Sequence, residues 1–189
     1  TLLPHYGKWR SSEITNSFYE SAPPNQWYHI VVTLDGEGNS QVYLNGQRSR
    51  YGHISFWRSE DRILQIGQSM ESYCCGNSAP FTGKIDSVKL FNHPLDGGEA
   101  LREMSGNASI SSYQPIDLSL DRYTVNGTSK QFLDRFTSQR VATCDSCILT
   151  QPPWQSGLDQ GAITVTLPDI RAMRYSMAIW LKPFDLSYV

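Results

Sequence analysis

The 189-residue sequence lacks any run of basic residues, and its charges are nearly balanced. Charged residues make up 18% of the chain, and the formal net charge is -2. A protein that binds nucleic acid needs a positive surface to neutralise the phosphates. We therefore expect no nucleic-acid partner.

Long apolar stretches are missing as well. A membrane-spanning helix requires roughly 20 consecutive apolar residues, and no segment approaches this length. No membrane insertion is expected. The chain starts at Thr1 with neither an initiating methionine nor a signal peptide, which leads us to expect a mature product or an excised piece of something longer.

Cysteine is scarce, and its spacing argues against a zinc site. The four thiols are an adjacent pair, Cys74 and Cys75, and a second pair, Cys144 and Cys147. Zinc needs four ligands arranged around the ion, which adjacent residues supply poorly, so we expect disulfides. Cys144 and Cys147 would form a short local bridge, whereas bridges from Cys74 or Cys75 to that segment would join distant parts of the chain.

Two N-glycosylation sequons are present, at Asn107 and Asn126. Both fall in polar connecting segments, where a glycan would be sterically possible. Together with the expected disulfides, they favour an extracellular or cell-surface protein.

What the sequence does contain is a series of short strands separated by turns. Residues 27–34 are rich in aromatic and β-branched side chains, which fit a half-buried strand. Residues 35–39 supply turn chemistry, residues 41–44 form a second strand, and Asn45-Gly46 is a strong hairpin signal. After a polar arm over residues 48–62, the chain continues with further strands.

These later strands are predicted at residues 63–67 and 81–91, and one helix follows them. Asp96 can accept a hydrogen bond from the first helical turn while Glu99 bonds back to it, which is the reciprocal pattern of a capping box. Gly106 is expected to end the helix.

The motifs of this stretch closely resemble the C-terminal half of a laminin G-like domain. In chain order they are Trp27 with residues 29–33, Asp35-Gly36, residues 42–46, residues 64–67, residues 81–88, and Leu95 with Glu99. The family belongs to the concanavalin A-like lectin and glucanase superfamily. The resemblance implies an all-β fold, a two-sheet antiparallel jelly-roll sandwich with one short helix.

The end of the chain resembles the opposite half of the same type of domain. Strands are predicted at residues 115–121, 162–167 and 175–183, and a strand that ends in Trp, an aliphatic residue, Lys and Pro is typical of an N-terminal laminin G-like half. The expected order is thus a C-terminal half over residues 1–106, a linker over 107–115 and an N-terminal half over 116–189.

Two explanations account for this inverted order. The chain is either a window across two neighbouring modules of a tandem array or one circularly permuted module. We favour the array, because laminin G-like modules are often repeated. In an array each half needs strands from outside the chain, and an isolated copy would expose sheet edges.

The resemblance also directs attention to enzymatic carboxylates, which the sequence lacks. Glucanases of the superfamily carry two glutamates that flank an aspartate at alternate strand positions, and retaining hydrolysis needs carboxyl groups about 5 Å apart. Glu60 and Asp61 are adjacent, and Glu99 lies with Glu103 on the predicted helix.

His29 matches a structural position of the family motif, where we expect it beside Trp27. The remaining histidines are His5, His53 and His93. No serine in a strained turn accompanies them, so the sequence indicates no catalytic triad.

Calcium is the cofactor that the resemblance implies. Many laminin G-like and pentraxin-like modules hold Ca²⁺ with carboxylates and carbonyls at a sheet rim. Asp86, Asp121 near the opening strand and Asp134 in the loop that follows match acidic positions of the family. The alternative is that each is a turn or surface aspartate. If the two halves belong to different modules, Asp86 and Asp121 would not share a site.

A cluster of arginine and aromatic residues is the best candidate for a recognition surface. Aromatic rings stack on sugars, and arginine supplies forked donors. The residues are Arg48, Arg50, Tyr51, Trp57 and Arg58, with Phe56 and Arg62 nearby. The alternative is a strand pair whose aromatics face the core while its arginines are solvated.

We therefore expect a non-enzymatic extracellular module of a larger protein. Its role would be structural, in a matrix, cell-surface or appendage assembly whose partners are neighbouring modules or subunits. The alternative is a carbohydrate-binding module, with glycans as partners and calcium as a potential aid.

Overall fold

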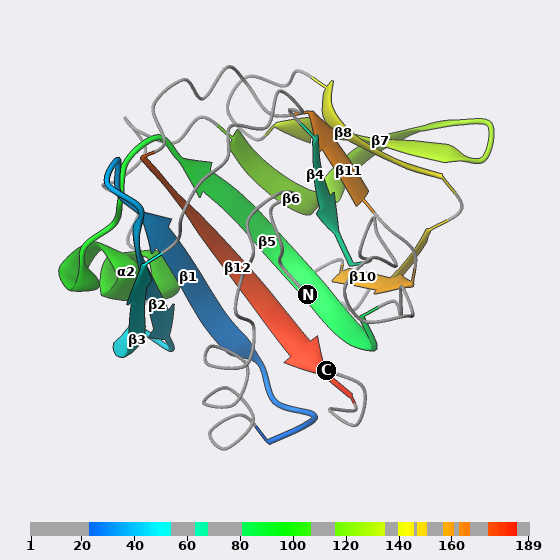
Figure 1. Cartoon of the computed structure of the whole chain (residues 1–189). Helices are drawn as coiled ribbons and strands as arrows, with labels where there is room; N and C mark the ends of the chain where they lie inside the picture. The colour runs from blue at the N-terminus through cyan, green and yellow to red at the C-terminus, as the bar shows by residue number, and fades with distance from the viewer. Residues whose placement is uncertain are drawn as a thin grey trace, which may run out of the picture.

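The computed structural model is built almost entirely of antiparallel strands (Figure 1). It describes residues 23–53, 63–67, 81–106, 116–134, 140–145, 147–150, 157–160, 163–166 and 174–184. Within these residues the chain has twelve strands and one helix, α2.

The part of the chain before residue 107 contributes five strands and the helix. They are β1 (Tyr28–Leu34), β2 (Asn39–Leu44), β3 (Gln47–His53), β4 (Ile63–Ile66), β5 (Gly83–Phe91) and α2 (Gly97–Met104). Asn45 and Gly46 form the β2–β3 turn with φ angles of 50° and 75°, which is the left-handed pair that a two-residue hairpin requires.

The part after residue 115 contributes seven strands. They are β6 (Ile116–Asn126), β7 (Ser129–Asp134), β8 (Arg140–Asp145), β9 (Ile148–Thr150), β10 (Gly157–Gln160), β11 (Ile163–Thr166) and β12 (Tyr175–Pro183).

The strands of the two parts are interleaved. Hydrogen-bonded neighbours follow the order β3-β2-β1-β12-β5-β6-β7-β8-β11-β4, and β10 pairs with β5 and β9. In Figure 1 the red strand β12, from the end of the chain, lies between the blue β1 and the green β5. The two parts therefore share one continuous antiparallel ladder.

Strand β6 carries the ladder from one layer of the fold to the other. Its first residues pair with β5, as in Val88 opposite Leu118, whereas the end from Tyr123 pairs with β7 after a shift of register. Buried side chains from both sides of this bend form a single cluster, which includes Ile30, Phe132 and Ile163. The ladder thus folds over its own apolar face, and the predicted all-β fold of jelly-roll type is confirmed.

The outer face of the β1–β12–β5 region carries the helix. Ala100 packs in a second buried cluster with Val31, Phe91 and Ala178. The predicted capping box is present, because the Asp96 side chain accepts from the Glu99 N–H and the Glu99 side chain accepts from the Asp96 N–H.

Several elements differ from the sequence-based expectation. Part of the predicted polar arm is strand β3, and Asp134, expected in a loop, ends strand β7. Strands β7 to β10 were not predicted. Their polar residues alternate weakly with apolar ones, and β7 buries only Phe132 and Asp134, so their pairing depends on neighbours rather than on local pattern.

We expect Ser176 to be important for stability, because its hydroxyl joins β12 to the segment before α2. It donates to the His93 carbonyl at 2.9 Å, accepts from the Leu95 N–H at 2.7 Å, and is fully buried. Ser176→Ala should lower the free energy of unfolding by roughly 1–3 kcal/mol, since it leaves buried backbone groups unpaired.

Urea denaturation measures this loss, with the exposed Thr124→Ala as the control that should change stability by less than about 0.5 kcal/mol. Equal stability of the two variants would contradict the assigned role of Ser176.

Candidate functional site

A shallow depression lies on the outer face beside the helix. Its volume is about 270 Å³. One wall is the β1–β2 hairpin, and the other is the segment that leads into α2. The lining residues are Thr33, Asp35, Asn39, Ser40, Gln41, Tyr43, Pro94, Leu95 and Asp96.

The hairpin wall is held by Asp35. Its Oδ1 accepts from the backbone N–H groups of Glu37 and Asn39, both at 2.8 Å, and its Oδ2 accepts from Asn39 Nδ2 at 2.7 Å. These hydrogen bonds lower the pKa of the Asp35 carboxyl, and the one from the Asn39 side chain has the largest effect. A fixed carboxylate therefore stands at the rim of the depression.

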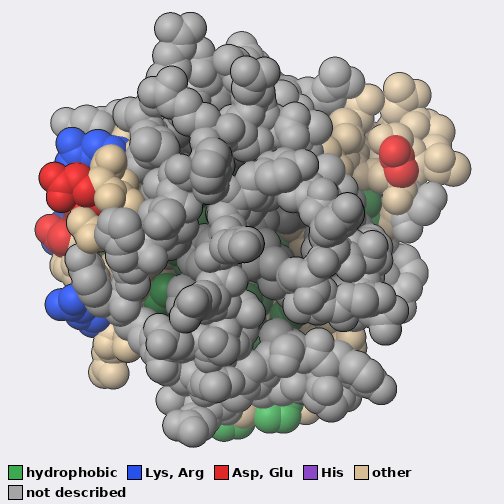
Figure 2. All heavy atoms as spheres, viewed as in Figure 1, with side chains coloured by type: hydrophobic (Ala, Val, Ile, Leu, Met, Phe, Trp, Pro, Cys, Tyr) green, Lys and Arg blue, Asp and Glu red, His purple; other side chains and the backbone are tan. Residues whose placement is uncertain are grey.

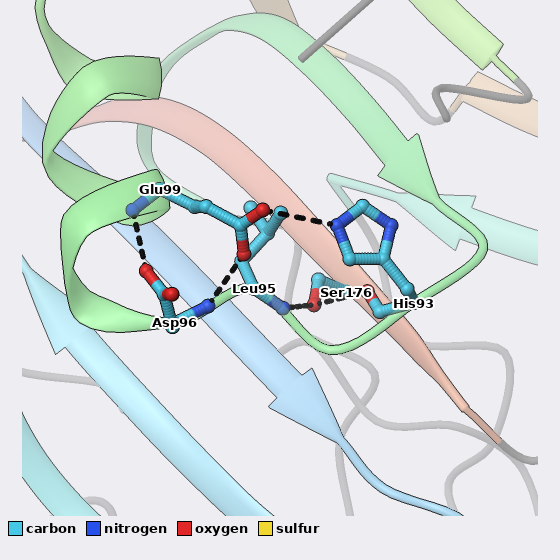
Figure 3. Close-up of polar contacts among 5 residues, drawn as sticks. All are labelled: His93, Leu95, Asp96, Glu99 and Ser176. Carbon is cyan, nitrogen blue, oxygen red and sulfur yellow. Dashed lines mark hydrogen bonds and ion pairs between the residues drawn. The ribbon is translucent and has the colours of Figure 1, made fainter. Parts of the chain in front are cut away.

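The opposite wall is held by the contacts drawn in Figure 3. Leu95 donates its N–H to Ser176, and Asp96 and Glu99 exchange the hydrogen bonds of the capping box. The helix N-terminus is thereby satisfied by the chain's own side chains. The N–H groups of Asp96 and Glu99 are therefore already occupied.

Figure 3 also brings together a serine, a histidine and a glutamate, yet they do not form a catalytic triad. The Nε2 atom of His93 lies 3.5 Å from Glu99 Oε1. The hydroxyl of Ser176, however, donates to the backbone carbonyl of His93 and not to its ring. A nucleophile requires a base at its hydroxyl and access to substrate, and Ser176 is fully buried. These residues have a structural role.

Gln41 and Tyr43 of β2 also line the depression. Burial raises the pKa of the Tyr43 phenol; Arg48 opposes this rise, and Asp96 and Glu99 add to it. The Nε2 atom of Gln41 is buried and has no hydrogen-bond partner in the part of the chain that the structure describes. The same lining thus contains this amide donor and the carboxylates of Asp35 and Asp96.

This arrangement is suited to binding rather than to catalysis. Its volume is close to the lower end of small-molecule sites, which is about 300 Å³. Carboxylate acceptors and an amide donor can hold a small polar group with hydroxyls. The sequence predicted Asp35 as a turn residue and Asp96 as a helix cap. Only the fold shows that they line the same depression as Gln41.

His29 is buried on the same outer face and makes no hydrogen bond through its ring. It is 1% exposed, and among the described residues neither ring nitrogen has a partner. Its ring lies 5.0 Å from that of Trp180 on β12, whereas Trp27, the expected neighbour, is 40% exposed. The expectation of a packed, structural histidine therefore agrees with its surroundings, but the aromatic contact comes from the other part of the chain.

The predicted calcium ligands are only partly described. Asp86 and Asp134 are buried; Asp86 accepts from the N–H of Ser87 at 2.7 Å, and Asp134 accepts from the N–H of Asp117 at 2.8 Å. The side chain of Asp121 lies outside the described residues. Over the residues that the structure describes, no group of three or more His, Cys, Asp or Glu side chains is placed to hold a metal. The three-aspartate site remains a prediction.

The predicted recognition cluster lies partly on β3. Arg48, Arg50 and Tyr51 belong to this strand, which ends the ladder, while Trp57 and Arg58 lie outside the described residues. Figure 2 shows acidic and basic side chains gathered on the side of the molecule where Figure 1 places α2 and β3. Recognition by this cluster remains a prediction.

The structure contains a disulfide between Cys144 and Cys147, the local one of the two expected arrangements. Cys74 and Cys75 lie outside the described residues. Of the two sequons, that of Asn107 also lies outside, and that of Asn126 falls at the exposed β6–β7 turn, where Gly127 has a φ of 62°. Such a position leaves room for a glycan.

The described residues include no helix that is both long and apolar enough to cross a membrane.

The fold and this site define an antiparallel β-sandwich module with a helix-covered outer face. In a comparison with protein families, residues 7–100 match the laminin G model of the concanavalin A-like lectin/glucanases superfamily. This match confirms, over these residues, the family resemblance that the sequence motifs predicted. Searches of curated proteins and of solved structures found no match. Laminin G-like domains are generally non-catalytic and typically extracellular.

We predict that stability depends on pH through His29. Burial, and secondarily the charge of Lys89, lowers its pKa from 6.5 to about 4. Lys89 is paired with the buried Glu103 of α2. The neutral ring is therefore favoured in the folded state, so its contribution is complete above the unfolded pKa of 6.5 and is lost as the pH falls towards 4. The loss amounts to about 3 kcal/mol at pH 4.

Unfolding by urea at pH 8 and pH 4 measures this dependence. His29→Leu should lose about 3 kcal/mol less than the natural protein between the two pH values. An equal loss in both proteins would show that His29 does not titrate as its burial implies.

Proposed function

We propose that this chain is a non-catalytic extracellular module of a larger, repeat-containing protein, with a structural and interaction role in a matrix, cell-surface or appendage assembly such as a fibre or flagellar hair. The observation that carries the proposal is the position of β12. A strand from the end of the chain lies at the centre of the sheet that residues 28–91 begin.

Each part of the chain depends on the other for its core. Ile30, Val88 and Leu90 from the first part are buried in one cluster with Leu118, Phe132 and Ile179 from the second. Separated, the parts would expose strand edges and apolar faces. Such a module is suited to connect copies in an assembly. If the second part of one copy completed the core of another, folding and association would occur in the same step.

The non-catalytic part of the proposal is supported by the family match, because laminin G-like domains are generally non-catalytic. Ser176 is buried and bonded to backbone, and Glu99 is engaged in the capping box. Glu103 is paired with Lys89. None of these groups is available to a substrate.

The proposal predicts that the natural protein, isolated without reduction, is far larger than the 21.4 kDa of this chain or runs as a multimer of it. Intact mass and peptide mapping, before and after glycosidase treatment, measure this. The glycosidase step also tests whether Asn107 and Asn126 carry glycans. A free monomer whose mass equals the chain plus only glycans would contradict a role in assembly.

A second candidate, carbohydrate binding, is favoured by the depression beside α2. Two lining carboxylates, Asp35 and Asp96, offer acceptors, and the buried Gln41 amide, which has no partner among the described residues, offers a donor; together they match sugar hydroxyls. The neighbouring strand β3 carries Arg48, Arg50 and Tyr51. Calcium, held by Asp86, Asp121 and Asp134, would assist such binding.

This candidate predicts a sugar-dependent rise in melting temperature. A ligand at a hundred times its Kd stabilises the native state by about 2.7 kcal/mol, a shift of several degrees. A glycan panel measured with calcium and with chelator tests sugar and metal together. Gln41→Met should abolish the shift, and the exposed Thr124→Ala should retain it. No shift with any glycan would exclude this candidate.

A further inference from the structure

We propose that the second part of the chain, residues 116–184, is exchangeable between copies, so that one copy inserts its β12 between β1 and β5 of another. The partner is thus a second copy of this chain. The inference rests on the proposed assembly function and names the contact through which assembly takes place.

The first argument is the length and position of the β12 contact. Strand β12 makes seven residue pairs with β1, from Tyr28 opposite Leu181 to Leu34 opposite Tyr175, and seven with β5. It is bonded on both edges, so its removal leaves two unpaired strand edges facing each other. Such edges are a template for another strand.

The second argument is that the first part is shaped for this particular strand. Gly83 has a φ of +158°, and a Cβ at this position would lie 2.3 Å from the carbonyl oxygen of Lys182. The Leu95 N–H and the His93 carbonyl are completed by the Ser176 hydroxyl. A strand without a small hydroxyl residue at this place would leave them unpaired.

The ends of β12 are anchored by backbone contacts as well. The Asn25 N–H donates to the Pro183 carbonyl at 2.7 Å, and the Phe184 N–H donates to the Thr82 carbonyl at 2.9 Å. The contacts of β12 with the first part therefore extend beyond β1 and β5, to Asn25 and Thr82. Within the described residues, β12 is the strand that meets all these requirements, and a second copy carries the same strand.

The third argument concerns how the two parts are joined. Among the described residues, five strand pairings join the two parts, and all are non-covalent. They are β1 with β12, β5 with β12, β5 with β6, β5 with β10 and β4 with β11. The backbone crosses from one part to the other only through residues 107–115. A closed copy and an exchanged pair make the same contacts and differ in this connection, which is the condition for exchange of parts between protomers.

Cysteine cross-linking in the full chain tests the exchange. Lys84 and Lys182 are half-exposed and directly opposite each other in the β5–β12 ladder, and the like charges there contribute no attraction. Two tagged chains, one with Lys84→Cys and one with Lys182→Cys, are mixed at the denaturation midpoint, refolded together and oxidised. The disulfide is identified by mass spectrometry of the joined peptides.

We expect a mixed dimer linked between positions 84 and 182. The control pairs Lys84→Cys with Val125→Cys, which lies on an exposed hairpin 67% accessible to solvent and away from the seam. Register partners should give at least about tenfold more mixed disulfide than this control, because only they meet disulfide geometry. Equal yields, or no mixed dimer, would overturn the exchange.

A locked chain separates this inference from the assembly function itself. Lys84→Cys/Lys182→Cys in one chain closes β12 onto its own β5. The locked chain should stay monomeric under conditions in which the natural chain associates, measured by light scattering. If the locked chain associates equally well, assembly uses another surface and the exchange is wrong. If neither chain associates, the assembly function fails as well.

Discussion

The insertion of β12 between β1 and β5 is the constraint on which the rest of the structure depends. Interior strands of a sheet need a partner on each edge, and here the central partner is supplied from the far end of the chain. The outer face depends on it too, because Ala178 completes the cluster under α2 and Ser176 fixes the segment that leads into the helix. One wall of the depression beside α2, at Leu95, is therefore held by a side chain from the second part.

This dependence connects fold and function. The core is buried only when two distant segments of the chain meet, and the proposed link between copies would use the same hydrogen bonds as the closed unit. His29 illustrates the consequence at the level of one residue. It lies on β1 opposite Trp180 of β12, and its ring is buried without a hydrogen-bond partner among the described residues. At this residue the two parts are joined by ring packing and by backbone pairing of β1 with β12.

Much of the fold was predictable because its signals are local. The strand at residues 27–34, the Asn45-Gly46 hairpin and the Asp96 to Glu99 capping box each depend on side chains close in sequence. Strands β7 to β10 escaped prediction, since short polar strands acquire their conformation from their neighbours. The expected neighbour of His29 was Trp27, but the aromatic ring beside it belongs to Trp180, 151 positions further along.

The sequence by itself determined the class of module, because alternation, turn residues and family motifs act over a few residues at a time. It also led to the prediction that the two halves stand in inverted order, which stays a prediction. Only the tertiary structure decided that these halves complete each other around β12 and that Asp35, Gln41 and Asp96 border one depression. The physical reason is that strand pairing joins edges without regard to distance along the chain, and no local pattern records which edge a strand will meet.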